Sequence, residues 1–546
     1  MKKINRLTLV LTLMAAGLFA GCASDEEATR ENQKIALDGS HFKFTEVAYQ
    51  ADLAVTRAAA SVKPTTVDLG DGLEAEVSVT PDAPTGKTRA VDPISDGKYT
   101  ILAFDATTHD LQGKLEGSVT GGVFTPDAGQ KLLLYPGTYD FTCFSEPVEY
   151  NEPNNRLVVR NWLTKSPTIG HVQATIAGDG YEVTFNMEHK AIRVRFNITS
   201  DILSENTPID AYLEGSIPGP WYWWHDWYTA YSGVLNNTGN ADFASERPLN
   251  FKTVAPVTTQ TGTTYTSDYV YMLQGIDGHD NLSAHPIHFT AGTIGGAPLA
   301  GKTVGVNVPS QWTTNQSITI NVNVKGQLYL FEDGKARVLA GKGTHTPIGV
   351  VLQQKWEPTN QKGMAIALKD VSNVTVAYTT PYNAAKMNTQ HNTTHYTDAN
   401  DAVNDMEGYK WTYEASGSVD GRIKANFSSD YTPFYQAANY NPGVMVTGTN
   451  VGKWYVPALG EWALSWKVLG QWDGNIPSWG MLTMSVAKMN NIFTAANGEA
   501  LKTYQYWNST EYEGMMIPVL YVGTAFSISS NATHNITGYV RPFVHF

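Results

Sequence analysis

Cysteine is almost absent from this sequence: Cys22 and Cys143 are the two cysteines in 546 residues. Cys22 directly follows an apolar leader and takes a separate role described below, so the mature chain keeps no pair for an intrachain disulfide. Cys143 lies in an apolar, strand-like run, which predicts a small buried residue and not a nucleophile. Packing alone is therefore expected to stabilise the folded chain.

The sequence also lacks the motifs that carry common chemistries. It has no H-E-x-x-H, no G-x-S-x-G, no phosphate-binding glycine loop and no cysteine pair with metal-ligand spacing. His391 and His395 stand four residues apart, but in an Asn/Thr-rich stretch that predicts a surface loop. Glu461 and Glu511 favour structural roles over acid/base work. We therefore expect no enzymatic activity, no catalytic residue, no metal site and no cofactor.

Positive charge and long apolar runs are scarce as well. The chain has 38 Lys and Arg against 51 Asp and Glu, a net charge of −13, and no cluster of basic residues. This acidity would repel phosphate backbones, which disfavours nucleic acid as a partner. One long apolar run occurs, at residues 7–18, and the mean hydropathy is −0.25, which argues against a polytopic membrane protein.

What is present begins with an export signal. Residues 1–21 combine a basic start with a short apolar stretch, and they end in Leu-Phe-Ala-Gly before Cys22. This pattern resembles a bacterial lipoprotein box, which implies lipid attachment, such as palmitate, on Cys22. The acidic run that follows, at residues 23–27, looks like the surface-export tag of lipoproteins in Bacteroides-type bacteria. The resemblance implies a lipoprotein on the outer membrane, exposed at the cell surface, with residues 22–45 as tag and tether.

Alternating apolar and polar residues predict strands through most of the chain. In residues 72–80 the alternation puts four apolar side chains on one face: Leu73, Ala75, Val77 and Val79. Similar strands are predicted at 99–104, 131–135, 138–144, 191–199 and 317–325. Short strands separated by turn residues are typical of antiparallel sandwiches. We expect a mainly β protein with two tandem antiparallel β-sandwich domains, at residues 46–199 and 200–326.

Helical spacing enters after residue 326. Four apolar residues with helical spacing predict one helix: Leu459, Trp462, Trp466 and Leu469. Residues 481–496 predict a second helix, which Gly498 would end, and Thr397 or Asp398 could cap a third that runs to Met406. Residues 327–546 are therefore expected to form an α+β domain.

Four segments within residues 45–326 together resemble the fimbrillin family, the pilus subunits of Bacteroides-type bacteria. They are the sequences at 88–90, 96–105, 134–141 and 185–194. This resemblance implies two transthyretin-like or Ig-like sandwiches.

Five further segments resemble the C-type-lectin-like paralogous domains found on surface proteins of the same bacteria. They are the sequences at 347–351, 363–370, 453–461, 506–512 and 539–543. The calcium motifs of lectins are matched only in part, at Glu357 and at Trp507, so no calcium-dependent sugar site is expected.

The fimbrillin resemblance implies assembly by donor-strand exchange. In that family an arginine-specific protease removes the first strand, and a strand of the next subunit fills the opened groove. Arg89, after the predicted strand at 72–80, is the candidate cleavage site, with Arg57 as second choice. A strand at the C-terminal end acts as donor in the family's stalk subunits, and here that end is taken up by the lectin-like segment. The resemblance therefore implies a tip subunit that accepts a strand from another pilus subunit.

A dense aromatic run stands at residues 221–228, within the segment expected to form the second sandwich. Its candidate ligand contacts are Trp221, Trp223, Trp224 and Trp227. Exposed aromatic faces stack on sugars or on a partner's apolar surface, but alternating aromatics also suit the core of a hairpin. Two functions thus remain open: a fimbrial tip adhesin that binds a glycan or a host or bacterial surface, or a non-polymerising surface lipoprotein that binds glycans.

Overall fold

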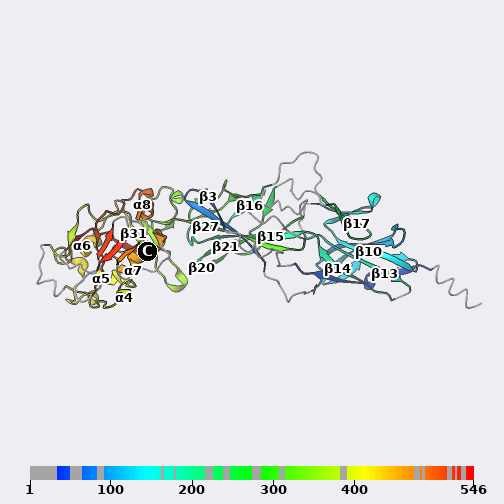
Figure 1. Ribbon diagram of the computed structural model, residues 1–546, viewed down its shortest axis with the longest axis horizontal. Helices are drawn as coiled ribbons and strands as arrows, with labels where there is room; N and C mark the ends of the chain where they lie inside the picture. Colours follow the sequence, from blue (N-terminus) through cyan, green and yellow to red (C-terminus); the bar gives the residue numbers. More distant parts are fainter. Residues whose placement is uncertain are drawn as a thin grey trace, which may run out of the picture.

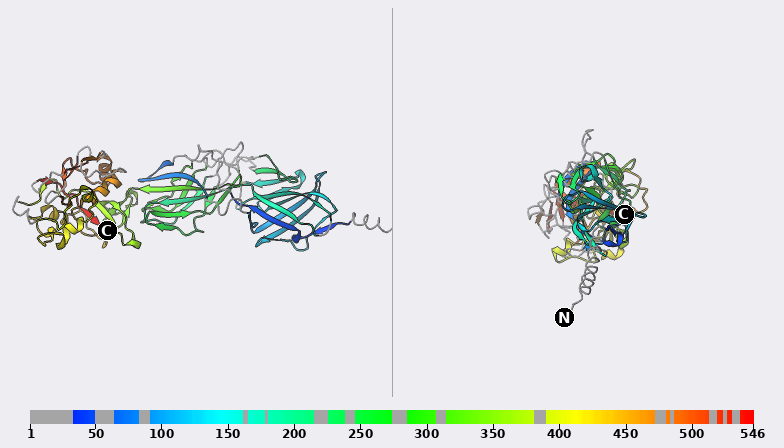
Figure 2. Two further views of the ribbon diagram at one scale, coloured as in Figure 1. Left: turned by 60° about the horizontal axis from the view of Figure 1, so that its bottom comes forward. Right: turned by 90° about the vertical axis from the view of Figure 1, so that its right-hand side faces the viewer.

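The protein is mainly β and elongated, with three bodies in a row (Figures 1 and 2). The computed structural model describes residues 33–49, 64–82, 91–160, 165–177, 180–214, 225–237, 246–273, 285–306, 314–380, 390–471, 480–482, 486–512, 519–522, 526–529 and 536–546. Along these residues, no helix combines the length and the apolar character that a membrane crossing needs.

The first body is built around a curled sheet in the order β5-β2-β14-β13-β10-β6-β7-β8. Its strands are β2 (Phe42–Val47), β5 (Val91–Asp92), β6 (Gly97–Asp105), β7 (Leu111–Thr120), β8 (Val123–Pro126), β10 (Gly137–Ser145), β13 (Thr168–Ile176) and β14 (Val183–His189). A short pair, β1 (Ile35–Leu37) with β9 (Leu132–Leu134), closes the same core.

A second, smaller sheet covers the outer face of this body. It has the order β11-β12-β17-β18, with β11 (Val148–Asn151), β12 (Arg156–Arg160), β17 (His225–Thr229) and β18 (Leu235–Asn237). Strand β6 is consequently buried on both faces: Ile101 and Ala103 face one core, while Leu102 and Phe104 face the other. Its unbroken apolar run follows from this double burial. Cys143 on the neighbouring β10 is fully buried, as predicted, and burial raises the pKa of its thiol.

The second body is a sandwich of two sheets. The larger has the order β20-β21-β15-β27-β4-β3 with β22 also on β15, and the smaller has the order β19-β16-β23-β26. The larger contains β3 (Thr65–Gly70), β4 (Leu73–Pro81), β15 (Ile192–Ser200), β20 (Val257–Thr259), β21 (Gly262–Thr266), β22 (Val270–Met272) and β27 (Ser317–Gly326). The smaller contains β16 (Asp210–Leu213), β19 (Arg247–Leu249), β23 (Ile287–Ala291) and β26 (Thr303–Val304), and a hairpin of β24 (Thr293–Ile294) and β25 (Ala297–Pro298) lies beside it.

The two sandwiches do not divide the chain at residue 199/200, where the sequence predicted the boundary. Strands β3, β4 and β15 all lie in the second body, although they belong to the segment expected to form the first. Strand β17 lies in the first body, although its aromatic run was expected in the second. Two pairs are parallel, β2 with β14 and β15 with β27, where all were expected to be antiparallel. Alternation shows which face of a strand is buried, but it contains no information about the neighbouring strand or its direction.

The third body is α+β, as predicted. Its central sheet has the order β29-β28-β30-β31-β38: β28 (Tyr329–Phe331), β29 (Ala336–Arg337), β30 (Pro347–Gln353), β31 (Met364–Ala367) and β38 (Phe543–His545). The remaining strands are β32 (Val376–Ala377), β33 (Gly480–Leu482), β34 (Gln505–Tyr506), β35 (Val519–Val522), β36 (Phe526–Ser529) and β37 (Thr537–Gly538). The helices are α4 (Ala399–Ala402), α5 (Gly408–Tyr413), α6 (Thr432–Ala438), α7 (Leu459–Leu469) and α8 (Val486–Ala495).

The predicted helix at Leu459–Leu469 is confirmed as α7, and all four of its spaced apolar residues are buried. The second prediction holds from Val486 onward, because residues 480–482 form a strand instead. The third reduces to the single turn of α4, where the carboxylate of Asp398 accepts a hydrogen bond from the backbone N–H of Asn400 (2.7 Å). Glu461 has a structural role, because its carboxyl group accepts the backbone N–H of Ala458 at the start of α7 (2.7 Å) and the Tyr455 hydroxyl (2.9 Å).

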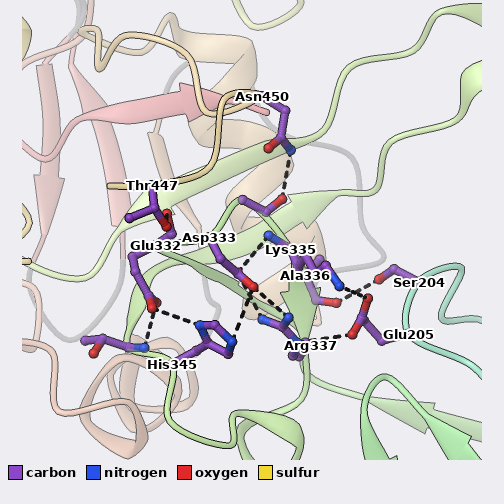
Figure 3. A network of polar contacts seen from close by, with 12 residues as sticks. Ser204, Glu205, Glu332, Asp333, Lys335, Ala336, Arg337, His345, Thr447 and Asn450 are labelled. Carbon is purple, nitrogen blue, oxygen red and sulfur yellow. Dashed lines mark hydrogen bonds and ion pairs between the residues drawn. The ribbon is translucent and has the colours of Figure 1, made fainter. Parts of the chain in front are cut away.

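A polar network joins the second and third bodies (Figure 3). The Arg337 guanidinium makes two hydrogen bonds to Asp333 (2.7 and 3.0 Å) and reaches Glu205 of the second body at 3.4 Å. Lys335 pairs with the same Glu205 at 3.0 Å, and the Ser204 hydroxyl donates to a backbone carbonyl of β29 (2.7 Å). Around this network, apolar residues of the third body's sheet share one core with the second sandwich. The two bodies are thus fixed to each other by packing and by paired charges.

Three of the five segments that resemble a lectin-like domain, at 363–370, 506–512 and 539–543, meet around one buried ion pair. Arg541 and Asp370 are both fully buried, and the Nε–Oδ1 distance is 2.6 Å. The Arg541 guanidinium also donates to the backbone carbonyls of Leu368 (2.9 Å) and Glu499 (3.2 Å), and the Tyr506 hydroxyl donates to Asp370 (3.1 Å). A buried pair with all its donors satisfied constrains the segments that supply it.

Removing one partner of this pair should destabilise the third body strongly. We expect Arg541→Met to lower its free energy of unfolding by about 3 to 5 kcal/mol, because Asp370 is left buried without its counter-charge. Urea titrations followed by tryptophan fluorescence measure this change. Lys467→Met, on the exposed side of α7, is the matched control and should change stability by less than about 0.5 kcal/mol. Equal effects of the two substitutions would contradict the role of the ion pair.

Candidate assembly site

Strand β4 comes from the N-terminal segment but lies in the larger sheet of the second body. We call the place that it fills beside β27 the slot. The strand lies between β27 and β3, and its nine residues pair antiparallel with β27 from Leu73↔Gly326 to Pro81↔Ile318. Leu73 and Ala75 are fully buried and Val77 is 3% exposed, while Val79 packs at the edge of the core. The predicted face of this strand is therefore confirmed, and it fills a continuous apolar slot.

Strand β27 borders the slot on one side within the same sheet, and the smaller sheet packs against the slot from the core side. Ile318, Ile320, Val322 and Val324 of β27 are all fully buried beside the strand. Without β4, their side chains and a row of backbone groups along β27 would face water. Such an edge is satisfied only by another strand, because a strand supplies both the hydrogen-bond ladder and the alternating side chains.

Asp82 anchors the end of β4. The residue is 8% exposed, and its carboxylate accepts hydrogen bonds from the hydroxyls of Ser317 (2.6 Å), Thr319 and Tyr269 (2.6 Å). Burial by itself raises the pKa of Asp82, but these hydrogen bonds and the guanidinium of Arg195, 3.4 Å away, outweigh burial and hold the pKa below its ordinary value. The ionised carboxylate thus fixes β4 to β27 directly after the last residue of the strand, Pro81.

At its other end, the slot opens into a cleft between the second and third bodies. The cleft has a volume of about 800 Å³, and the β3–β4 turn forms one wall. Gly326, Leu352 and Ile492 also line it. A strand in the slot can therefore continue past the position of Leu73 without meeting packed core.

The same N-terminal segment also supplies strands to the first body. Strand β2 pairs in parallel with β14 over five residues, and Phe42 stacks on Phe185 with ring centroids 6.2 Å apart. Beyond β2, the Tyr49 ring stacks on His189 at 3.8 Å, and the Arg193 guanidinium lies 4.1 Å from the centre of the Tyr49 ring. Residues 33–82 therefore contribute to both sandwiches.

Most of the residues singled out from the sequence lie outside the described residues. This holds for the lipid-attachment residue Cys22, the cleavage candidates Arg89 and Arg57, and three of the ligand candidates, Trp221, Trp223 and Trp224. In the sequence, the described residues on either side of Arg89 are Asp82 and Val91. Asp82 lies in the second body and Val91 in the first.

Sequence reasoning missed Asp82 and β2. The tether expected at residues 22–45 is wrong from Ile35 onward, because β1 and β2 form there. The side-chain partners of Asp82 and the β14 partner of β2 lie more than a hundred residues away in the sequence, so no local pattern marks them.

Trp227 is described and divides the aromatic run into two faces. Its neighbour Tyr228 is 2% exposed and packs in the core between the two sheets of the first body. Trp227 is half-buried on the other face of β17, with the Arg156 guanidinium 3.9 Å from the centre of its ring. The core interpretation of the run is confirmed for Tyr228, whereas ligand binding by Trp227 stays a prediction.

No cluster of three or more histidine, cysteine or acidic side chains that could hold a metal ion occurs in the described ranges. His391 is half-buried in a loop, with its Nδ1 3.7 Å from Glu511.

Together, the fold and the site define a class: an elongated protein of two β-sandwiches and an α+β domain, whose N-terminal segment completes both sandwiches.

Solved structures to which this chain is similar include fimbrial and adhesion proteins. A fimbrial protein from Bacteroides ovatus matches over 94% of this chain and 100% of its own, with 11% identity and a TM-score of 0.28. A fimbrial assembly protein from Parabacteroides distasonis covers 53% of this chain and 91% of its own, with 8% identity and a TM-score of 0.26. A candidate cell adhesion protein from Bacteroides fragilis covers 52% and 93%, with 14% identity and a TM-score of 0.29. No protein-family model and no curated protein matches the sequence.

Asp82→Asn should loosen β4 in its slot. The amide keeps the shape but loses the charge that the three hydroxyls and Arg195 stabilise, so we expect a loss of about 2 kcal/mol in the free energy of opening β4. Hydrogen exchange of the β4 and β27 amides measures this opening. Glu74→Gln, an exposed change on the same strand, is the control. Unchanged protection of β4 in Asp82→Asn would show that the carboxylate does not hold the strand.

The attachment of β4 should also weaken in acid. Because the folded-state pKa of Asp82 lies below its ordinary value, the unfolded state binds more protons between the two pKa values. The stabilisation is complete above about pH 4 and is lost as the pH falls through the folded-state pKa. Urea midpoints measured between about pH 5 and about pH 2 should fall more steeply for the wild type than for Asp82→Asn. Parallel pH profiles would contradict this assignment.

Proposed function

We propose that this protein is a fimbrial subunit that is assembled by strand exchange at the slot of β4. The observation that supports it most is the position of β4: an N-terminal strand completes the core of the second body, although residues 83–90 separate it from β5 in the first. One cut after Arg89 would detach β1, β2, β3 and β4 from the rest of the chain. Both sandwiches would then lack strands at once.

The side chains that line the slot limit which strand could replace β4. The incoming strand must present apolar side chains at alternate positions, of sizes that fit the places of Leu73, Ala75 and Val77. A small residue is required at the Ala75 position, because this side chain is fully buried in a packed core. The cleft at the Leu73 end leaves room for such a strand to extend.

The two candidate cleavage sites would have different consequences. A cut after Arg57 removes β1 and β2 but leaves β3 and β4 attached, so the second sandwich stays complete. A cut after Arg89 would also detach β3 and β4, and the slot beside β27 would then be open to solvent. Since strand exchange needs the open slot, Arg89 is the site that fits this function.

We place the subunit at the tip of the fimbrium. Strand β38, at the C-terminal end of the described chain, pairs with β31, and Phe543 and Val544 are fully buried. It is committed to the third body and is not free to enter a neighbouring subunit. The third body would then act as the lectin-like adhesin domain. The partners would be another pilus subunit and a glycan or a host or bacterial surface.

A non-polymerising surface lipoprotein that binds glycans is the second candidate function. It is favoured by Trp227, whose ring lies on the outer face of β17 and could stack on a sugar. In this case lipid on Cys22 would remain on all of the protein at the outer membrane, and β4 would keep its place in the mature form.

The N-terminus of the protein recovered from the cell surface separates these functions. We expect Ala90 as the first residue, detected by mass spectrometry, and co-purification with filaments. Arg89→Ala should keep the N-terminal segment and be absent from filaments, while Arg57→Ala, the matched control, should be processed as the wild type. Lipidated Cys22 on all of the surface protein would overturn the fimbrial proposal and leave the anchored lipoprotein.

A further inference from the structure

A lysine is enclosed in the third body, away from the slot and from the central sheet. Lys424 is 1% exposed, and its ammonium group donates a hydrogen bond to the side-chain oxygen of Asn392, which is itself 2% exposed. The rings of Phe434 and Tyr431 lie 4.9 and 5.7 Å from the Lys424 nitrogen. A cation and an amide are thus in direct contact in surroundings from which water is excluded.

The orientation of the Asn392 amide is fixed from both ends. Its Nδ2 donates to the backbone carbonyl of Ser509 (2.8 Å), which leaves Oδ1 to face Lys424. Its backbone N–H donates to the Glu511 carboxylate (2.9 Å), and Glu511 is 2% exposed. Since a C=O bond is about 1.2 Å long, a nitrogen in hydrogen-bonding contact with Oδ1 lies roughly 3 to 4 Å from the amide carbon. This is near the separation from which two groups react.

The surroundings make the lysine a nucleophile. Burial lowers the pKa of Lys424 to about 8, although Glu511 and Asp420 oppose this effect. Asp420 is engaged elsewhere, because it accepts the hydroxyls of Tyr431 (2.6 Å) and Ser418 (2.7 Å). Roughly one amine in ten is therefore neutral at pH 7, more than for an ordinary lysine, and a neutral amine can attack a carbonyl carbon.

We propose that Lys424 and Asn392 become joined by an isopeptide bond. The neutral Nζ of Lys424 attacks Cγ of Asn392, and a C–N bond forms. The bond from Cγ to Nδ2 then breaks, and Nδ2 leaves as ammonia after taking one proton that originates on Nζ. The products are one secondary amide and one ammonia, so atoms balance, and no oxidant, reductant or cofactor is needed.

The proposal assigns the proton transfer to Glu511, for which the sequence had favoured a structural role. Its carboxyl group is held against the backbone of Asn392, and its charge acts on Lys424. In this position it accepts the proton from the attacking amine and returns it to the departing nitrogen. The Ser509 carbonyl, which accepts from Nδ2 before the reaction, keeps the departing nitrogen turned away from the lysine.

The bond would tie together two segments that are 32 residues apart in the sequence, the loop at Asn392 and the short helical turn that begins at Lys424. Cys143, the cysteine among the described residues, is a free buried thiol in the first body, so it cannot supply such a link. A covalent link of this kind needs no oxidising compartment, and it would resist tension on the third body.

Mass spectrometry of the purified full chain after digestion with trypsin tests the proposal. We expect a branched peptide that contains both Asn392 and Lys424, lighter by one ammonia than its two parts, and no cleavage after Lys424. The wild-type protein alone shows whether the bond forms. Recovery of the Asn392 peptide and the Lys424 peptide as separate species, with no loss of ammonia, would overturn the proposal.

Three variants define the roles of the residues. Lys424→Met and Glu511→Gln should lack the branched peptide, while Lys410→Met, a lysine of α5 outside this cluster, should retain it. A branched peptide that persists in Lys424→Met would overturn the assignment of the lysine. One that persists in Glu511→Gln would overturn the role of Glu511 as the proton carrier.

Discussion

The pairing of β4 with β27 is the contact on which the arrangement of the protein depends. It places an N-terminal strand between β27 and β3 in the second sandwich, while β2, which precedes β3 in sequence, and β5, which follows β4, belong to the first. The chain therefore passes from the first body to the second and back before the first core is complete. The two sandwiches share one N-terminal segment, and a change in that segment affects both of them.

The third body is attached by a different kind of interaction. Its sheet buries one face against the core of the second sandwich and the other against α7 and α8, so it acts as a wall common to two cores. Arg337 and Glu205 add paired charges at the rim of this junction. The slot of β4 opens at this same junction, so a strand that enters the slot is bordered by the third body at one end.

Two kinds of buried polar group serve two purposes in this structure. Asp82 and Arg541 are fully provided with partners, which makes them fixed points of the fold. Lys424 has a partner, Asn392, with which it can react, so its burial has a chemical consequence as well as a structural one. The difference lies in the partner: a hydroxyl or carboxylate satisfies a charge, whereas an amide carbon can also accept a nucleophile.

The amino-acid sequence by itself determined several strands, β4 among them, and the main helix. The alternation of Leu73, Ala75 and Val77, and the spacing of Trp462 and Trp466, are local patterns, and local patterns report which side of an element is buried. Tertiary structure alone decided which sheet each strand joins, why β2 and β4 separate into two bodies, and which residues meet Asp82 and Lys424. These contacts link residues far apart in the chain, and their selection depends on the packing of whole sheets, which no short window of sequence contains.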